Sequence, residues 1–226
     1  MNSIGKIIAI VVLVSVSVFS GPSVYIGGGL NISSTTATDS LSATKTPRNG
    51  FNVAVGFEQS LTDHFSLVSG FSLETRGERT ESTTDIGDAS GSVISVVESD
   101  IDFFYLQIPL FVQYNIPLGP GKINLFAGPE MGILLVGELQ SVDNTTIPST
   151  GIALPAVHDT VDLASRMKLA DGGISIGAGY EITFGSSAVF LRPSCYFGLT
   201  DYFITGPEGK LRNIRIAGGY KFTFSK

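Results

Sequence analysis

A strict two-residue alternation of apolar and polar side chains runs through residues 103–135 and constrains the fold more than any other feature of the sequence. Successive side chains of a β-strand point to opposite faces, so the alternation indicates two strands. Residues 117–121 between them are rich in proline and glycine, which end a strand and reverse the chain. These residues therefore predict a β-hairpin with one apolar and one polar face.

The composition of the two faces distinguishes a membrane barrel from a soluble sandwich. The apolar face is formed by Phe104, Leu106, Ile108, Leu110, Val112 and Tyr114, and after the turn by Ile123, Leu125, Ala127, Met131, Ile133 and Leu135. The opposite face carries Gln, Asn, Gly and Glu in place of a dense set of Lys and Glu. A membrane barrel turns its apolar side chains to lipid, whereas a sandwich packs them inside. The pattern favours the barrel, with a soluble sheet as the alternative.

The first twenty residues have the features of a secretory signal peptide. Lys6 precedes an apolar run from Ile7 to Phe19, and small residues suit cleavage after Ser20. The run is shorter than the roughly 20 residues of a transmembrane helix, so an uncleaved anchor is the lesser alternative. No linker divides the remainder. We predict a cleaved signal peptide over residues 1–20 and one barrel domain over residues 21–226.

The spacing of the remaining alternating segments predicts the topology. Further strands are expected at residues 23–32, 51–59, 65–76, 173–184, 188–199 and 211–224, with long loops at 33–48, 77–102, 138–170 and 200–210. Inner parts of the second loop, such as Val93–Val97, are expected to extend the strands beyond the membrane. Long and short connections thus alternate, as in outer-membrane barrels, where short turns lie in the periplasm and long loops outside. The sequence therefore predicts an all-β, transmembrane, antiparallel up-and-down β-barrel of about eight strands in the outer membrane, with both termini periplasmic.

Charged side chains on the polar faces are expected inside this barrel. By strand parity they are Glu58, Glu74, Arg76, Glu130, Glu181, Arg192, Arg215 and Lys221. Charges in a narrow lumen persist only if they are paired, and a barrel of about eight strands is just wide enough for side chains to fill it. We expect a salt-bridged plug and no open pore.

Three prolines, Pro109, Pro129 and Pro193, fall within predicted strands, where a closed barrel has no free edge to accommodate a missing N–H. We expect them to mark bulges or strand ends near an interface.

Several short motifs resemble the PorT-like family of outer-membrane β-barrel proteins of Gram-negative bacteria. Residues 105–110 (YLQIPL) are similar to the YLxIPL strand of the family, residues 127–129 to its AGP-type strand, and residues 196–201 (YFGLTD) to its Y-x-GLTD stretch. The chain ends Phe224-Ser225-Lys226, whereas the family's final strand ends on an aromatic residue. The resemblance implies an outer-membrane barrel, and the family's namesake is associated with protein secretion.

Composition and motifs exclude several classes of function. Of 14 basic and 20 acidic side chains only Lys6 lies in residues 1–20, so the remainder has a net charge near −7, which excludes a basic nucleic-acid surface. The single cysteine, Cys195, permits no intramolecular disulfide and no thiolate metal cluster. No cofactor motif is present. Acidic residues within 78–102 suit a divalent cation by chemistry, but their spacing matches no calcium loop, and we interpret them as solvated.

We expect a non-enzymatic cell-surface barrel whose loops serve surface interaction or secretion-complex assembly. Its partners would be outer-membrane lipid, the barrel-assembly machinery, and secretion-complex proteins or extracellular ligands. Its aromatic lipid belt would include Phe104, Tyr114, Tyr180, Phe184, Tyr220, Phe222 and Phe224. Two alternatives remain open: a small lipid-modifying enzyme using His158 with Ser149 or Ser165, and an exported soluble barrel that binds a hydrophobic ligand.

Overall fold

The computed structural model describes residues 21–36, 43–88, 91–147, 150, 152–163, 166–204 and 209–224. The expected signal peptide over residues 1–20 lies outside the described residues. The described part contains ten strands: β1 (Ser23–Thr35), β2 (Ala43–Ser60), β3 (Phe65–Asp88), β4 (Gly91–Leu118), β5 (Gly121–Ile147), β6 (Ile152–Ala153), β7 (Val157–Asp162), β8 (Ala170–Phe184), β9 (Ser187–Gly198) and β10 (Leu211–Thr223). No helix among the described residues is long and apolar enough to cross a membrane.

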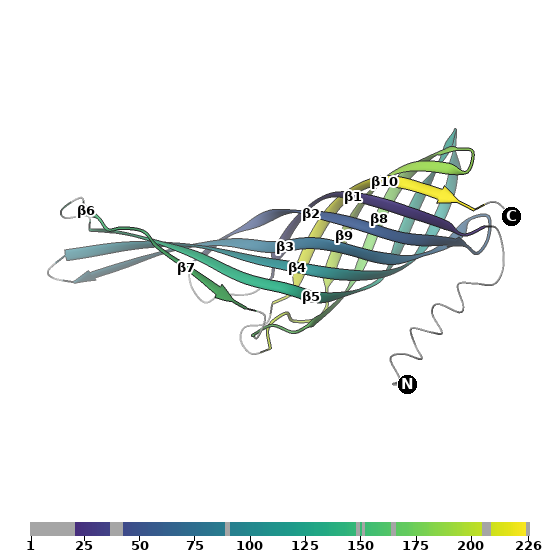
Figure 1. Cartoon of the computed structure of the whole chain (residues 1–226). Coiled ribbons are helices and arrows are strands. Elements are labelled where there is room, and N and C mark those ends of the chain that lie inside the picture. The colour runs from purple at the N-terminus through teal and green to yellow at the C-terminus, as the bar shows by residue number, and fades with distance from the viewer. Residues whose placement is uncertain are drawn as a thin grey trace.

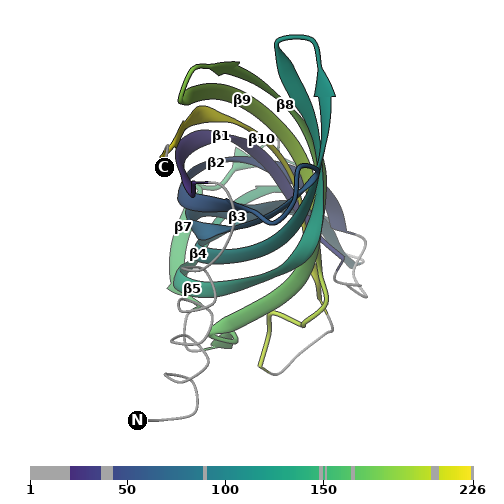
Figure 2. The same ribbon diagram turned by 90° about the vertical axis from the view of Figure 1, so that its right-hand side faces the viewer.

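Eight of these strands close into a barrel, which Figure 2 shows from one end. Each is antiparallel to its neighbours in the order β1, β2, β3, β4, β5, β8, β9, β10. The ring is completed by β1 and β10, which pair from Ser23↔Thr223 to Thr35↔Leu211. The predicted eight-stranded up-and-down barrel is therefore confirmed.

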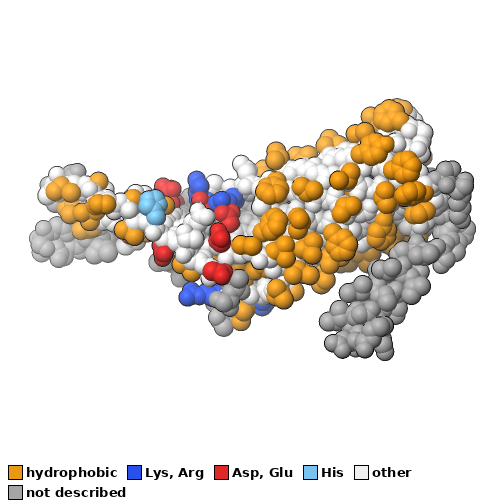
Figure 3. All heavy atoms as spheres, in the orientation of Figure 1, with side chains coloured by type: hydrophobic (Ala, Val, Ile, Leu, Met, Phe, Trp, Pro, Cys, Tyr) orange, Lys and Arg blue, Asp and Glu red, His pale blue; other side chains and the backbone are white. Residues whose placement is uncertain are grey.

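The barrel wall turns its apolar side chains outward. On β1, for example, Ile26 and Leu30 are 60% and 72% exposed, whereas their sequence neighbours Tyr25 and Asn31 are buried. Figure 3 shows the resulting apolar surface on the face of the barrel turned to the viewer. All seven expected belt aromatics lie on the outward parity and are exposed or half-exposed. An apolar surface of this extent is typical of a lipid-facing wall and excludes the soluble alternative.

The two ends of the barrel differ. At one end, the turn end, β2–β3, β4–β5 and β8–β9 are joined by short turns, and Gly119 and Gly185 adopt φ of 56° and 62°. The start of β1 and the end of β10 lie at this end as well. The other connections lie at the opposite end, the loop end (Figure 1).

At the loop end three strands continue far beyond the barrel. β3 and β4 stay paired as far as Asp88↔Gly91, while β5 pairs with β7 from Glu138↔Asp162 and with β6 at Thr146↔Ala153. Residues 91–102 of β4 alone span about 40 Å at 3.3 Å per residue. We call residues 43–48, 77–88, 91–102, 138–147, 152–153 and 157–162 the loop-end sheet (Figure 1).

The loop-end sheet corrects the expected loops at 33–48, 77–102 and 138–170, which are partly strand. Most of its residues are polar on both faces, so the alternation that identifies a lipid-facing strand is missing there. The expected extension of the strands at Val93–Val97 is confirmed, because these residues lie in β4.

The three prolines do not mark bulges, because the pairing register is unchanged across each of them. Instead, the pairing with one neighbouring strand is interrupted for two residue pairs at each proline. At Pro109 the gap lies between Ser69↔Leu110 and Ser72↔Gln107, and at Pro129 it lies between Pro109↔Glu130 and Val112↔Ala127. At Pro193 it lies between Gly177↔Ser194 and Tyr180↔Leu191. A missing N–H is thus accommodated by a short gap in the ladder. At Pro109, Ser69 Oγ donates to the proline carbonyl at 2.7 Å.

Candidate functional site: the barrel interior

Glu58, Lys122, Glu181, Arg192 and Lys221 form a turn-end ionic cluster across the lumen. Lys221 Nζ lies 3.1 Å from Glu58 and 2.5 Å from Glu181, and Lys122 Nζ lies 3.4 Å and 3.6 Å from the same carboxylates. Arg192 approaches Glu58 at 3.3 Å. Two acids are therefore shared by three bases. A cavity of about 650 Å³ lies on the turn-end side of this cluster, and Lys122 and Lys221 are among the residues that line it.

A layer of aromatic and polar side chains lies next to the turn-end ionic cluster, on the side toward the loop end. Here Tyr25 and Phe190 pack edge to face with their ring centroids 5.9 Å apart, and the Arg192 guanidinium lies 4.5 Å from the Phe190 ring centroid. A cavity of about 90 Å³ remains in this layer. Asn52, Gln107 and Gln113 line it, each with a buried side-chain atom that has no hydrogen-bond partner among the described residues. The space suits a few water molecules.

Glu74, Arg76, Glu130, Asp171 and Arg215 form a second, loop-end ionic cluster. Arg215 donates in a bidentate manner to Glu130, at 2.6 Å and 2.8 Å. Arg76 donates to Glu74 through Nε at 2.6 Å and to Asp171 at 3.2 Å. All five side chains are at most 11% exposed. Charge-assisted pairs in this geometry hold the side chains in fixed positions.

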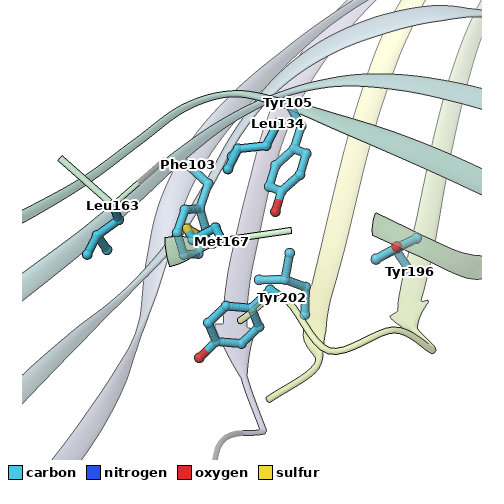
Figure 4. Packing of buried hydrophobic residues seen from close by; sticks show 8 residues of the cluster. Phe103, Tyr105, Leu134, Leu163, Met167, Tyr196 and Tyr202 are labelled. Atoms are coloured by element: carbon cyan, nitrogen blue, oxygen red, sulfur yellow. The ribbon is translucent and has the colours of Figure 1, made fainter. Parts of the chain in front are cut away.

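An aromatic cap closes the lumen at the loop end. It consists of Phe103, Tyr105, Leu134, Leu163, Met167, Tyr196, Tyr202 and Leu211 (Figure 4). Leu163, Met167 and Tyr202 come from the β7–β8 and β9–β10 connections, so these segments fold back over the barrel. Tyr196 links the cap to the ionic cluster, since its hydroxyl donates to Asp171 and its ring centroid lies 4.1 Å from the Arg76 guanidinium.

Interior rings rest on glycines of neighbouring strands. A Cβ added to Gly173 would lie 2.5 Å from a ring carbon of Tyr196, and one added to Gly177 would lie 2.3 Å from the Phe126 ring. Glycine therefore makes room for aromatic rings inside the narrow barrel.

The structure places all eight charged residues expected inside the barrel in these two clusters, and each cluster contains two acids and two bases of the eight. Sequence reasoning missed Lys122 and Asp171. Both have inward strand parity, but they lie just before the positions where we expected β5 and β8 to begin. With them the two ionic clusters hold five acids and five bases.

The residues considered for catalysis are not brought together. His158 is exposed on β7, opposite Val142 in the loop-end sheet. Ser149 and Ser165 lie outside the described residues. Among the residues that the structure describes, no group of three or more His, Cys, Asp or Glu could hold a metal ion. Acids of the expected second loop instead form ion pairs, such as Asp100 and Asp102 with Arg48 at 3.1 Å and 2.7 Å.

A lipid-facing wall and a lumen filled by ionic layers beneath an aromatic cap define an integral membrane β-barrel without an open pore. Residues 21–203 match the family described as outer membrane protein beta-barrel domain. The chain belongs to this family, and the protein is an outer-membrane β-barrel.

Solved structures of similar architecture include bacterial surface proteins. Ail, the attachment invasion locus protein of Yersinia pestis, has 13% identity and a TM-score of 0.43, and the match covers 90% of this chain and 100% of that chain. Neisserial surface protein A has 10% identity and a TM-score of 0.44, with 90% and 99% covered. OprG from Pseudomonas aeruginosa has 12% identity and a TM-score of 0.40, with 92% and 97% covered. No curated protein sequence matches the chain.

Proposed function

We propose that this protein is a non-enzymatic outer-membrane barrel that presents the loop-end sheet to a protein partner in a secretion complex or outside the cell. The observation that carries the proposal is the length of the central strands. β4 and β5 have 28 and 27 residues, whereas a membrane-spanning strand needs about 9–11. The additional residues do not help to close the barrel, and ordering them costs conformational entropy.

The chemistry of the loop-end sheet indicates the kind of partner. Its sequence contains eleven acidic and three basic residues. Ile152 and Val157 are exposed near its tip. Within the described residues β7 pairs only with β5, so its other edge has backbone groups available for an added strand. These features suit a partner with a basic surface that binds along the β7 edge.

The PorT-like resemblance of residues 105–110, 127–129 and 196–201 supports a secretion complex as the setting. In this proposal the loop end faces the exterior, both termini lie in the periplasm, and the barrel-assembly machinery inserts the protein. The alternation of short and long connections supports this orientation.

A shortened variant tests the proposal. Residues 84–95 and 141–159 would each be replaced by Asn-Gly, a dipeptide that favours a tight hairpin turn, so that Val157 and half of the β7 edge are removed. Because neither deletion reaches the barrel, the variant should keep the heat-modifiable gel migration of a folded barrel. A photo-crosslinker at Val157 should join wild-type protein to one partner, and His64, which is exposed at the turn end, is the control position.

The two outcomes are distinct. A defined crosslink at Val157 on intact cells that is absent at His64 supports the proposal. Wild-type secretion and surface phenotypes in the folded, shortened variant would contradict it.

Replacement of His158 tests the non-enzymatic part of the proposal. His158→Ala should leave the acyl chains of the surface lipid unchanged, because the imidazole is exposed in the loop-end sheet, away from the lipid belt. Mass spectrometry of extracted surface lipid provides the measurement. Altered acylation in this variant would favour the enzyme.

A further inference from the structure

Among the residues that the structure describes, the basic side chains outside the lumen fall into two groups at the loop end. Lys45, Arg48 and Arg79 belong to the loop-end sheet, and each is paired with an acid. Four others form no ion pair within the part of the chain that the structure describes. We call these four the basic patch: Arg166, Lys168, Lys210 and Arg212.

Backbone hydrogen bonds bring the basic patch together. Lys168 N donates to Tyr202 O at 2.9 Å, and Ile204 N donates to Arg166 O at 3.0 Å. Tyr202 N in turn donates to Gly209 O at 3.1 Å, immediately before Lys210. Three short segments therefore lie side by side and carry four cations on the β8–β10 side of the barrel.

The basic patch lies at the boundary of the lipid belt that is nearer the loop end. Arg212 points outward on β10, paired with the exposed Phe197 and two residues before the exposed Ile214. Next to the other cations, Leu169 and Ile204 are 69% and 57% exposed. Long basic side chains beside exposed apolar ones are the arrangement in which a cation reaches the headgroup layer while its stem remains in apolar surroundings.

We propose that the basic patch binds the phosphate groups of anionic lipid headgroups in the leaflet at the loop end. Arginine recognises phosphate in a bidentate manner, and lysine contributes a point charge. On the β2–β4 side, Arg48 and Arg79 are already neutralised by Asp100 and Asp102. The barrel thus holds anionic lipid on one side only. This inference does not depend on which leaflet the loop end meets.

The test compares lipid selectivity in two charge variants. Wild-type protein in micelles containing phosphatidylglycerol and phosphatidylcholine would be examined by native mass spectrometry for bound lipid. In the variant R166Q/K168Q/K210Q/R212Q the preference for phosphatidylglycerol over phosphatidylcholine should fall at least about tenfold. Each basic side chain near an anionic surface contributes to the attraction of anionic lipid. The matched control K45Q/R48Q/R79Q removes basic charge from the paired side and should keep the preference. Heat-modifiable migration checks that both are folded.

Three further measurements make the result decisive. Wild-type preference should weaken as ionic strength rises. If the fourfold variant does not fold, Arg212→Gln alone should still reduce the preference. At equal ionic strength, inorganic phosphate should displace no more lipid than chloride does, because it lacks acyl chains to contact Leu169 and Ile204. Equal preference in wild type and the fourfold variant, or greater displacement by phosphate than by chloride at equal ionic strength, would overturn the proposal.

Discussion

Arg76 is the residue on which the loop-end ionic cluster depends most. Its guanidinium is fully buried and contacts Glu74, Glu130 and Asp171. Removing one partner of a buried ionic group leaves uncompensated charge, which costs about 3–5 kcal/mol. We therefore expect Arg76→Met to lower the free energy of unfolding by about that amount in urea titrations of the protein in lipid vesicles.

Arg79 supplies the control for that prediction. It also makes an arginine–carboxylate pair, with Asp100 at 2.7 Å, but its side chain is 56% exposed. Exposed pairs contribute little because water already solvates both charges. Arg79→Met should leave the unfolding midpoint nearly unchanged. If both variants were equally stable, the loop-end ionic cluster would not stabilise the barrel.

Asp100 makes the order of the loop-end sheet depend on pH. The hydrogen bonds from Arg79 hold the pKa of Asp100 below its ordinary value, against the opposing effect of burial. A carboxyl with a lowered pKa in the folded state contributes stability above its unfolded pKa, and this contribution is lost as the pH falls through the folded pKa. Burial raises the pKa of the neighbouring Asp102, which acts in the opposite direction.

We therefore expect Asp100→Asn to loosen β3 and β4 of the loop-end sheet at neutral pH, and the difference from wild type to shrink as the pH falls below about 4. Amide hydrogen exchange, corrected for its intrinsic pH dependence, measures this difference. A difference that stayed constant across the acidic range would show that the Asp100 charge is irrelevant.

At the scale of elements, the glycines that support interior rings set how closely strands approach. Gly173→Ala would place a methyl group 2.5 Å from both the Tyr196 ring and the Phe197 carbonyl oxygen. Overpacking of this kind costs about 1–3 kcal/mol. Gly218→Ala is the control, because its nearest neighbour would lie at 3.5 Å. Urea unfolding in vesicles should separate the two variants, and equal stabilities would contradict the close packing of β8 on Tyr196.

The elements also show what the sequence can predict. The alternation of side chains along single strands was sufficient to predict the barrel wall. Lipid on one side and polar or charged partners on the other impose strict alternation, as at Ile26 and Asn31. It was insufficient for the loop-end sheet, where water contacts both faces and long-range pairing of β3 with β4 supplies the order. Lys122 and Asp171 were missed for a simpler reason, since strand ends are less sharply marked than strand interiors.

At the scale of the whole molecule, the two ends of the barrel differ in structure. Ion pairs, interior rings and the aromatic cap close the lumen, while an acidic sheet projects from the loop end and a basic patch lies at its base. We therefore expect no stepwise conductance from the purified protein in planar bilayers, because a passing ion would have to separate the buried pairs of both ionic clusters. Discrete channel openings at neutral pH would contradict a sealed lumen.

The central claim is that apolar side chains face lipid while ion pairs fill a closed barrel. Gel migration of the detergent-extracted outer-membrane fraction, compared before and after boiling, tests it most directly. A closed barrel resists detergent until it is heated, so boiling should change the migration of the protein. Recovery in the soluble fraction with no shift on boiling would mean that the apolar faces form a core, and the account would be wrong.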